Sequence, residues 1–243
     1  MFQQEETFKL RVAENERTAL VYPGADASRR ASPVVLMFHG FGGNARAAAR
    51  RYAIHSAWKE ATVVYPQGLV NTSPRLMRSG FGWQRRPGES QDRDLKFVDA
   101  LLTELKARYR VDEKKVYACG MSNGALFCFL LLAERPQPFA AFATVAGAGG
   151  VLLLRARTPR PVLMINGRAD TLVSFASAER TRDMLRWLNG CGNEEKEWAK
   201  GCVTYLPVKG QNHVVFCAHD GGHDWTPDAT AHIVRFFKEH SLP

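Results

Sequence analysis

Ser122 stands in the middle of Gly120-Met121-Ser122-Asn123-Gly124, a G-x-S-x-G pattern. The apolar run Val116–Cys119 before it predicts a buried strand, and the apolar stretch Ala125–Ala133 after it predicts a helix. A serine on a tight turn between a strand and a helix is typical of a nucleophile elbow, where its hydroxyl can attack a carbonyl carbon. The pattern alone arises by chance in many chains, so the interpretation depends on these flanking elements and on partners elsewhere.

A serine nucleophile needs a base, and the base needs an acid that orients it. In this architecture the acid and then the histidine follow the serine, each at the C-terminal end of a later strand. Asp170 comes after the predicted strand Pro161–Ile165, and His223 comes after the predicted strand His213–Cys217. The sequence therefore predicts a triad of Ser122, Asp170 and His223 at one edge of a sheet.

Other side chains compete for these roles. His213 and His219 lie near His223, and His219 with His223 could be imagined as metal ligands. His213 begins a predicted strand, however, and the glycines before His223 break any helix that would place His219 on the same face. The alternative acids, Asp183 and Asp224, do not directly follow a buried strand. We expect neither a metal nor an organic cofactor, since a serine triad needs neither.

A glycine-rich loop, His39-Gly40-Phe41-Gly42-Gly43-Asn44, follows the continuous apolar segment Val34–Phe38. An H-G-x-G-G loop after a strand, upstream of a nucleophile elbow, is the usual source of one oxyanion-hole donor. We predict that the backbone N–H of Phe41 is this donor and that the N–H of Asn123, at the start of a helix, is the other. A plain glycine turn is the alternative interpretation.

Strand-like and helix-like segments alternate along the chain, which predicts an α/β fold with a mostly parallel central sheet, helices on both faces and one domain over residues 1–243. Asp92 or Asp94 is expected to cap the second helix, and Thr226 and Pro227 are expected to open the last one. The other predicted strands are Phe8–Val12 and Thr18–Tyr22 (a hairpin), Ala61–Tyr65, Phe139–Val145 and Val203–Leu206; the other predicted helices are Arg46–Lys59, Asp94–Tyr109, Ser177–Leu188 and the segment from Thr226 to His240.

The segment Asn71–Gln91 is rich in Gly, Pro, Ser and Arg and is predicted to be a long loop in the pocket wall. It carries Phe81 and Trp83, and we predict Trp83 to be a substrate platform. The alternative is that Trp83 only anchors the loop on the core. An aromatic rim would suit an aryl ester, and Arg85 with Arg86 would favour an acidic substrate. The rim is expected to contain Phe41, Phe81, Trp83, Phe175 and Trp225.

The composition is that of an ordinary globular protein, and the balance of charges is basic. The 243 residues include 33 Lys and Arg against 24 Asp and Glu, a net charge of +9. The arginines are scattered and no aromatic-basic RNA motif accompanies them, so we expect a solvated basic surface and no nucleic-acid partner. No apolar run is long enough to cross a membrane, and the residues before the first strand lack the apolar region that we expect of a signal peptide. These observations fit a cytoplasmic protein or the mature form of a secreted one.

Five cysteines are present, and they differ in their expected roles. Cys119 and Cys128 fall in the predicted strand and helix around the elbow, so we expect both to be buried as small apolar residues. Cys191 and Cys202 flank a polar loop that they could close as a disulfide in an oxidising compartment. The sequence contains no C-x-x-C motif and no zinc-ligand spacing.

Taken together, these motifs resemble those of the α/β-hydrolase esterases of the polyhydroxybutyrate depolymerase and feruloyl esterase type, which are similar to carbohydrate esterase family 1. The resemblance runs from about Thr18 to the C-terminus. The segments that carry it are HGFGGN, YPQG, DLKFVDALL, VDEKKVYACGMSNGA, TVAG, NGRAD, LNGC and GGHDW. The chain departs from the family pattern in that Thr226 separates Trp225 from Pro227, and Val208 occupies the place of the usual partner of Cys191.

This resemblance implies a serine carboxylic-ester hydrolase that acts through an acyl-enzyme on aryl, feruloyl-type esters or on short hydroxyacid esters, as small molecules or oligomers. It implies the same triad and oxyanion donors, with Trp225 beside the acyl pocket. It also favours a secreted or periplasmic mature form. Alternatives are a general short-chain carboxylesterase, another acyl-transfer hydrolase, or a non-catalytic binding protein, which would be expected to have lost a triad residue. Oligomeric state is not predicted.

Overall fold

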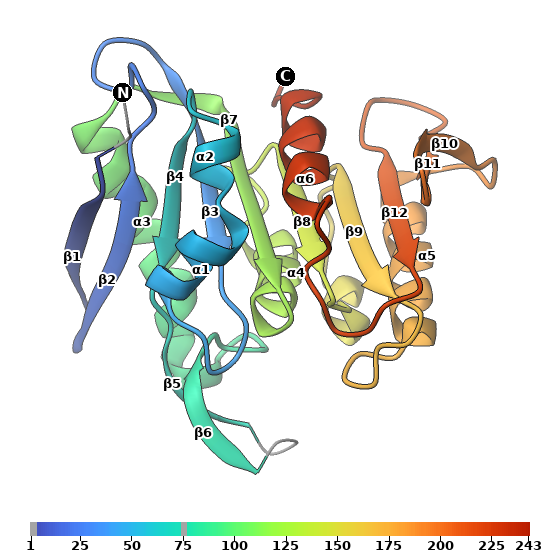
Figure 1. The fold of residues 1–243 in the computed structure, drawn as a ribbon, viewed down its shortest axis with the longest axis horizontal. Coiled ribbons are helices and arrows are strands. Elements are labelled where there is room, and N and C mark those ends of the chain that lie inside the picture. Colours follow the sequence, from blue (N-terminus) through green and yellow to red (C-terminus); the bar gives the residue numbers. More distant parts are fainter. Residues whose placement is uncertain (1–3, 74–76) are drawn as a thin grey trace.

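A single twisted sheet runs through the molecule in the computed structural model, which describes residues 4–73 and 77–243 (Figure 1). Its strand order is β1-β2-β4-β3-β7-β8-β9-β12-β11-β10. The strands are β1 (Glu6–Val12), β2 (Asn15–Tyr22), β3 (Ser32–Phe38), β4 (Thr62–Pro66), β7 (Val111–Met121), β8 (Ala141–Val145), β9 (Val162–Gly167), β10 (Lys196–Ala199), β11 (Cys202–Tyr205) and β12 (Val214–His219).

The middle of this sheet is parallel and its edges are antiparallel. From β4 through β3, β7, β8 and β9 to β12 every neighbour pair is parallel. The β1–β2 hairpin and the β10–β11–β12 meander complete the two edges with antiparallel pairs. The prediction of a mostly parallel sheet is confirmed, and so is the predicted N-terminal hairpin. The parallel arrangement brings the C-terminal ends of β3, β7, β9 and β12 to one edge, where the predicted site residues follow.

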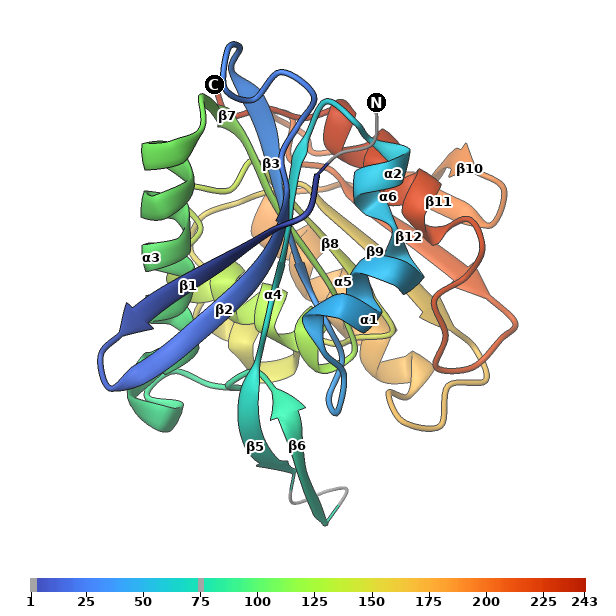
Figure 2. The ribbon, with the colours of Figure 1, turned by 60° about the vertical axis from the view of Figure 1, so that its left-hand side comes forward.

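Helices cover both faces of the sheet, as predicted. One face carries α1 (Ala45–Tyr52), α2 (Ile54–Ala57) and α6 (Ala229–Lys238), while the other carries α3 (Arg93–Arg108), α4 (Asn123–Glu134) and α5 (Phe175–Asn189) (Figures 1 and 2). The one helix expected over Arg46–Lys59 is broken in two, because Ala53 between α1 and α2 has a left-handed backbone conformation with φ of 44°. Short 3-10 turns lie at Glu89–Asp92 and Gly150–Leu154.

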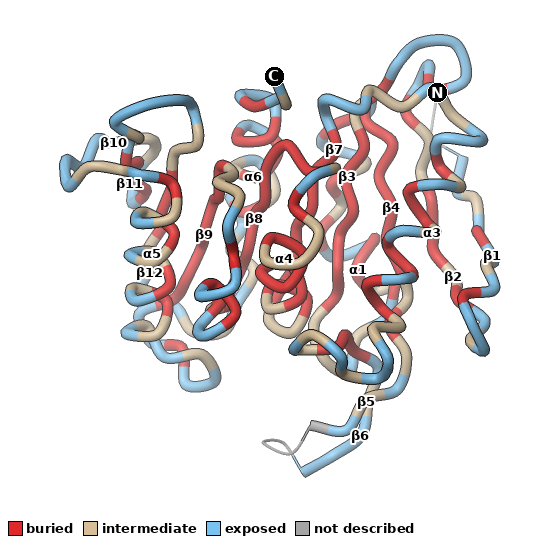
Figure 3. Tube along the Cα trace, turned by 180° about the vertical axis from the view of Figure 1, so that it is seen from behind, coloured by how far each residue is buried: buried red, intermediate tan, exposed pale blue. Residues whose placement is uncertain are grey.

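Each face of the sheet has its own apolar core, visible as the buried central strands in Figure 3. Strand β3 shows how one strand serves both cores. Leu36 and Phe38 pack in the α3–α4–α5 core, whereas Val35 and Met37 pack in the core under α1, α2 and α6. Successive side chains of a strand point to opposite faces, so a strand covered on both sides is apolar at every position. This is the physical reason for the continuous apolar run in the sequence.

The start of α3 differs from the prediction. The helix begins at Arg93, and the side chain of neither Asp92, which occupies the N-cap position, nor Asp94 accepts its first N–H groups. The Gln84 side chain does so instead, since its Oε1 accepts the backbone N–H groups of Asp94 and Leu95 at 3.0 and 3.2 Å. The Asp94 carboxylate is completely buried and forms an ion pair with Arg17 at 2.8 Å. Asp94 therefore ties α3 to β2, a role that a local capping pattern cannot reveal.

Two other boundaries were also placed wrongly. Helix α6 begins at Ala229, after a turn in which the Ala229 N–H donates to the Thr226 carbonyl, so Thr226 and Pro227 precede the helix. The segment Asn71–Gln91 is only partly a loop. It contains most of an antiparallel hairpin, β5 (Leu69–Ser73) with β6 (Arg78–Gly82), that projects below the sheet edge in Figure 1. Residues 74–76 of that predicted loop lie outside the described residues.

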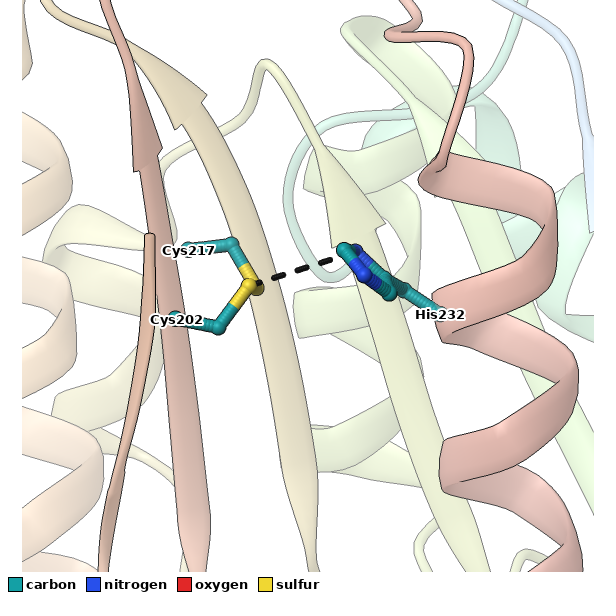
Figure 4. Close-up of side chains that lie close together, drawn as sticks. All are labelled: Cys202, Cys217 and His232. Atoms are coloured by element: carbon teal, nitrogen blue, oxygen red, sulfur yellow. Dashed lines mark hydrogen bonds between the residues drawn. A yellow bond between two sulfur atoms is a disulfide. The ribbon is translucent and has the colours of Figure 1, made fainter. Parts of the chain in front are cut away.

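The disulfide that Cys191 and Cys202 could have formed is not present. Cys202 bonds to Cys217, which lies directly opposite it in the β11–β12 register (Figure 4). The Cys191 thiol donates to the carbonyl of Asn212. Cys191 pairs with neither, because it sits after α5 at an isolated bridge to Pro207. Cys119 and Cys128 are buried free thiols, as expected, and burial raises the pKa of both. Within the described residues, no helix is long and apolar enough to span a membrane.

Candidate active site

Ser122 occupies a strained turn between β7 and α4. Its backbone has φ of 55° and ψ of −114°, and its N–H donates to the Val145 carbonyl of β8 at 2.9 Å. The glycines on either side allow this turn. A Cβ at Gly120 would lie 2.4 Å from the Gly124 carbonyl, and a Cβ at Gly124 would lie 2.2 Å from the Phe38 carbonyl oxygen. Strain of this kind is typical of functional positions, because it holds one side chain in a defined direction. The predicted elbow is confirmed as a backbone geometry.

Asp170 follows β9 in the loop that the sequence predicted. Its carboxylate is buried, and both oxygens are engaged. Oδ1 accepts the backbone N–H groups of Leu172 and Val173, each at 2.8 Å. Oδ2 lies 2.7 Å from Nδ1 of His223. With the proton on Nδ1 directed at this carboxylate, Nε2 of His223 is unprotonated and able to take a proton from a hydroxyl.

The loop that carries His223 leaves β12 and packs against the Asp170 loop. The N–H of Arg168 donates to the His219 carbonyl at 2.7 Å, and the N–H of Ala169 donates to the Gly221 carbonyl at 3.1 Å. These main-chain bonds fix the two loops relative to each other. The main chain alone therefore determines where Asp170 and His223 lie relative to each other.

The competing residues lie elsewhere. His213 packs against His240 with a ring separation of 4.6 Å, and Asp183 forms an ion pair with Arg186 on α5. His219 accepts the N–H of Gly221 through Nδ1. Among the described residues, the one cluster of three metal-ligating side chains is Cys202, Cys217 and His232 (Figure 4). Its sulfurs are joined to each other, and the cluster does not include His219 or His223.

The predicted oxyanion loop is held in place by buried polar side chains. His39 donates from Nδ1 to the Gly40 carbonyl at 2.8 Å and accepts the Gly68 N–H on Nε2 at 3.0 Å. Burial lowers the pKa of His39, which keeps the ring neutral as this donor–acceptor pair requires. Gln67 accepts the N–H of Ala45 at 2.9 Å, at the start of α1. The loop therefore connects β3 rigidly to the Gln67-Gly68 turn.

Asn123 and Trp83 form the other support of this loop. The Asn123 side chain accepts the Trp83 N–H at 2.7 Å and donates to the Trp83 carbonyl at 3.2 Å. Trp83 in turn donates from Nε1 to the His39 carbonyl at 2.9 Å. Because the amide side chain is occupied, only the backbone N–H of Asn123 is free for an oxyanion. It lies in the first turn of α4, where N–H groups have no partner within the helix.

Of the two interpretations of Trp83, the structure fits the anchoring one better than the substrate platform. Trp83 belongs to the wall of a cavity, but its side chain is completely buried (0% exposed) and stacks on Phe127 with centroids 5.4 Å apart. The indole ring therefore packs mainly as part of the core. Two sets of contacts explain why Trp83 is buried. Its backbone bonds to the Asn123 side chain, and its ring packs against apolar neighbours. No local pattern in the sequence distinguishes such a tryptophan from an exposed one.

Two cavities meet at Ser122. The first, of about 450 Å³, lies between the hairpin, α4 and the Asp170 loop, and the second, of about 270 Å³, lies between α1, the oxyanion loop and His223. Ser122, Phe41 and Leu172 line both. The remaining first-cavity residues include Asn71, Thr72, Arg85, Asn123, Leu126, Ala148 and Val173; the second cavity adds Asn44, Arg51, Tyr52, Arg78 and His223.

The other predicted substrate contacts lie at the margins. Phe81 is exposed on β6 and lines neither cavity, although its carbonyl accepts the Gly42 N–H at 2.7 Å. Trp225 packs on Tyr52 with ring centroids 4.1 Å apart and donates to Thr230. It thus supports the second cavity from behind. Arg51 and Arg78 at this cavity were not predicted from the sequence, because nothing in their local pattern sets them apart from the other scattered arginines.

Comparisons with known proteins find esterases. The family model "Esterase PHB depolymerase" matches residues 17–159, a segment that includes the oxyanion loop and Ser122 but ends before Asp170. "Putative esterase NocK" of Nocardia uniformis subsp. tsuyamanensis is 35% identical over 63% of this chain and 44% of its own length. "Feruloyl esterase B" of Piromyces equi is 24% identical over 91% of this chain and 45% of its own length. The chain thus spans about half the length of these relatives.

Solved structures show the same fold. The acetyl xylan esterase from Aspergillus awamori superposes with a TM-score of 0.69 at 14% identity, covering 96% of this chain and 99% of that structure. The Bacillus cereus carboxylesterase superposes with a TM-score of 0.63 at 20% identity, covering 92% of this chain and 94% of that structure. The predicted α/β-hydrolase fold is confirmed by these superpositions.

Proposed function

This chain belongs to the Esterase PHB depolymerase family, and from that premise we propose that it is a serine carboxylic-ester hydrolase with Ser122, Asp170 and His223 as its triad. The observation that carries the proposal is the 2.7 Å contact between Asp170 Oδ2 and His223 Nδ1, in a cavity that Ser122 and His223 both line. That contact sets the tautomer in which the histidine acts as a base.

The reaction follows from the placement of these groups. As Ser122 Oγ forms its bond to the ester carbonyl carbon, its proton passes to Nε2 of His223. The buried Asp170 carboxylate stabilises the imidazolium, and the N–H groups of Phe41 and Asn123 receive the negative carbonyl oxygen. The C–O bond to the alcohol then breaks, and His223 gives its proton to the leaving oxygen. Water, deprotonated by His223, cleaves the acyl-enzyme and restores the serine.

The proposed substrates are aryl esters of the feruloyl type or short hydroxyacid esters. In support, the first cavity is large enough at about 450 Å³ for a ring-bearing acyl group, and Leu126, Leu172 and Val173 give it an apolar wall. Feruloyl esterases also stand among the relatives that match this chain. The ligand is a small-molecule or oligomeric ester.

The test is a panel of esters offered to the wild type and two variants. The panel contains p-nitrophenyl acetate, butyrate and octanoate, methyl ferulate and a soluble hydroxybutyrate oligomer. Ser122→Ala and Asp170→Asn should each lower kcat by about 10³-fold or more, with unchanged circular dichroism. Preference for methyl ferulate or the oligomer supports the substrate class, and preference for short p-nitrophenyl esters indicates a general carboxylesterase. Equal activity of wild type and Ser122→Ala would refute the proposed function.

A further inference from the structure

The two cavities at Ser122 differ in charge. The second contains Arg51 from α1 and Arg78 from β6, and no carboxylate is among its lining residues. Their guanidinium groups lie over the rings of Tyr52 and Phe41 at 6.0 and 5.7 Å from the centroids. In the described part of the chain neither arginine forms an ion pair, so both positive charges remain available to a ligand.

Two other arginines near the site are paired with carboxylates. Arg85, in the first cavity, forms an ion pair with Glu89 at 3.2 Å. Arg46, which shares α1 with Arg51, forms one with Glu5 at 3.1 Å. The two cavities therefore differ in charge, since the arginine of the first is paired with a carboxylate and the two arginines of the second are not. A net charge of +9 adds a long-range attraction for anions.

This inference rests on the proposed function. In that reaction, each cavity can be assigned to one half of the ester substrate. His223 must reach the leaving oxygen in order to protonate it. His223 lines the second cavity and is absent from the lining of the first. The alcohol half of the substrate therefore occupies the second cavity, and the acyl half occupies the first.

We propose that the second cavity is an anion subsite in which Arg51 and Arg78 bind a carboxylate carried by the alcohol or phenol half of the ester. A guanidinium group donates two N–H bonds to a carboxylate, and the rings of Tyr52 and Phe41 face the two guanidinium groups from within the cavity wall. The enzyme then prefers leaving groups that are carboxylate-bearing over neutral ones of the same size.

The test compares two substrates that differ in charge on the leaving group, 4-acetoxybenzoate and 4-acetoxybenzamide. For each enzyme, kcat/KM on the anionic ester is divided by kcat/KM on the neutral one, and variants are compared by this ratio so that intrinsic reactivity cancels. Arg51→Gln and Arg78→Gln should each lower the ratio about fivefold, and the double variant should lower it about twentyfold. The loss should be in KM, because the contact exists before the reaction begins.

Arg46→Gln is the matched control, because it removes the same charge from the same helix at a position outside the cavity. Its ratio should stay within about twofold of wild type. Added salt should also reduce the wild-type preference, since both guanidinium groups are exposed. An unchanged ratio in the double variant, or an equal fall in Arg46→Gln, would overturn the proposal.

A second substrate pair carries the charge on the acyl side: mono-4-nitrophenyl succinate and 4-nitrophenyl butyrate. If the arginine substitutions lower this ratio and leave the first unchanged, the cavities are assigned in reverse and the proposal fails. Ser122-dependent hydrolysis of 4-acetoxybenzamide distinguishes that failure from failure of the proposed function. If the ester is still hydrolysed and the arginine substitutions leave the ratio of the two kcat/KM values unchanged, only the proposal of the anion subsite is refuted.

Discussion

Gly167, at the end of β9, lies against Gly221 in the loop that carries His223. A Cβ at Gly167 would stand 2.3 Å from the carbonyl oxygen of Gly221 and 2.3 Å from that of Gly222. Real Cβ atoms are not found so close to backbone oxygens, so only glycine fits between the two loops. The distance between Asp170 and His223 thus depends on the absence of a Cβ at Gly167, three residues before Asp170.

Gly167→Ala should push the His223 loop away from the Asp170 loop and weaken their 2.7 Å contact. A displacement of about 1 Å at a catalytic group costs on the order of 10²-fold in rate, so we expect kcat to fall 10- to 100-fold. Steady-state kinetics on p-nitrophenyl butyrate measure this loss. Gly192→Ala is the control, because nothing lies within 4 Å of its Cβ position. Full activity in Gly167→Ala would mean that the loops can separate without disturbing the triad.

Trp83→Phe should affect the oxyanion loop and not substrate recognition. It removes the donor to the His39 carbonyl and leaves that buried oxygen without its partner, at a cost of about 1–3 kcal/mol of unfolding free energy. Kinetically, kcat should fall by a similar factor for every ester. Urea unfolding and the ester panel measure both effects, with the exposed Trp187→Phe as control. A rise in KM for methyl ferulate alone would show instead that Trp83 contacts the aromatic group.

The disulfide pairing predicts which cysteine matters for stability. Cys202→Ser/Cys217→Ser opens a loop with a sequence separation of 15, which should lower the free energy of unfolding by about 3 kcal/mol. Cys191→Ser should change it little, since the Cys191 thiol only donates to a carbonyl. Urea unfolding of the oxidised proteins gives both values. Equal destabilisation by the two changes would contradict the observed pairing.

His213 should make stability depend on pH. Burial, together with the nearby His240, lowers the pKa of His213 to about 4, whereas Glu239 acts in the opposite direction. Between about pH 6.5, the pKa in an unfolded chain, and about pH 4 the unfolded state binds a proton that the folded state does not. The free energy of unfolding therefore falls as pH is lowered through this window, by up to about 1.4 kcal/mol per pH unit for this histidine.

Urea titrations at about pH 7.5 and about pH 5 should show this loss in the wild type. His213→Gln should reduce the difference between the two pH values, because glutamine does not titrate. His240 and His39, whose pKa values burial also lowers, should leave part of the difference in place. An identical difference in wild type and His213→Gln would exclude His213 as a contributor.

The parts of the site that the sequence predicted well depend on neighbours in the chain. The elbow at Ser122 needs two glycines at fixed spacing, and those glycines relieve contacts within the same strand–turn–helix unit. The positions of Asp170 and His223 follow from strand order, because parallel strands end at one edge. Apolar periodicity and the spacing of nearby residues are therefore enough to predict the elbow and the loops that follow the strands. The contacts between these side chains were then found where the order predicted them, while their catalytic roles remain a proposal.

The features that were missed depend on pairings across the fold. Cys202 meets Cys217 only because of the β11–β12 register, and a polar strand such as β6 has no apolar alternation to mark it. From the sequence, Asp94 is a candidate helix cap. Its ion pair with Arg17 forms only because the fold brings strand β2 beside the start of α3. Each of these errors concerns a partner that only the folded chain brings into contact.

The β5–β6 hairpin has an evolutionary consequence. Its first strand supplies Asn71 and Thr72 to one cavity, and its second strand supplies Arg78 to the other. None of the proposed triad residues lies on it, and it projects from the sheet edge on its own (Figures 1 and 2). Exchange of this one segment between relatives would alter the walls of both cavities together while Ser122, Asp170 and His223 stayed in place. A change of substrate range can thus require the exchange of only one short segment.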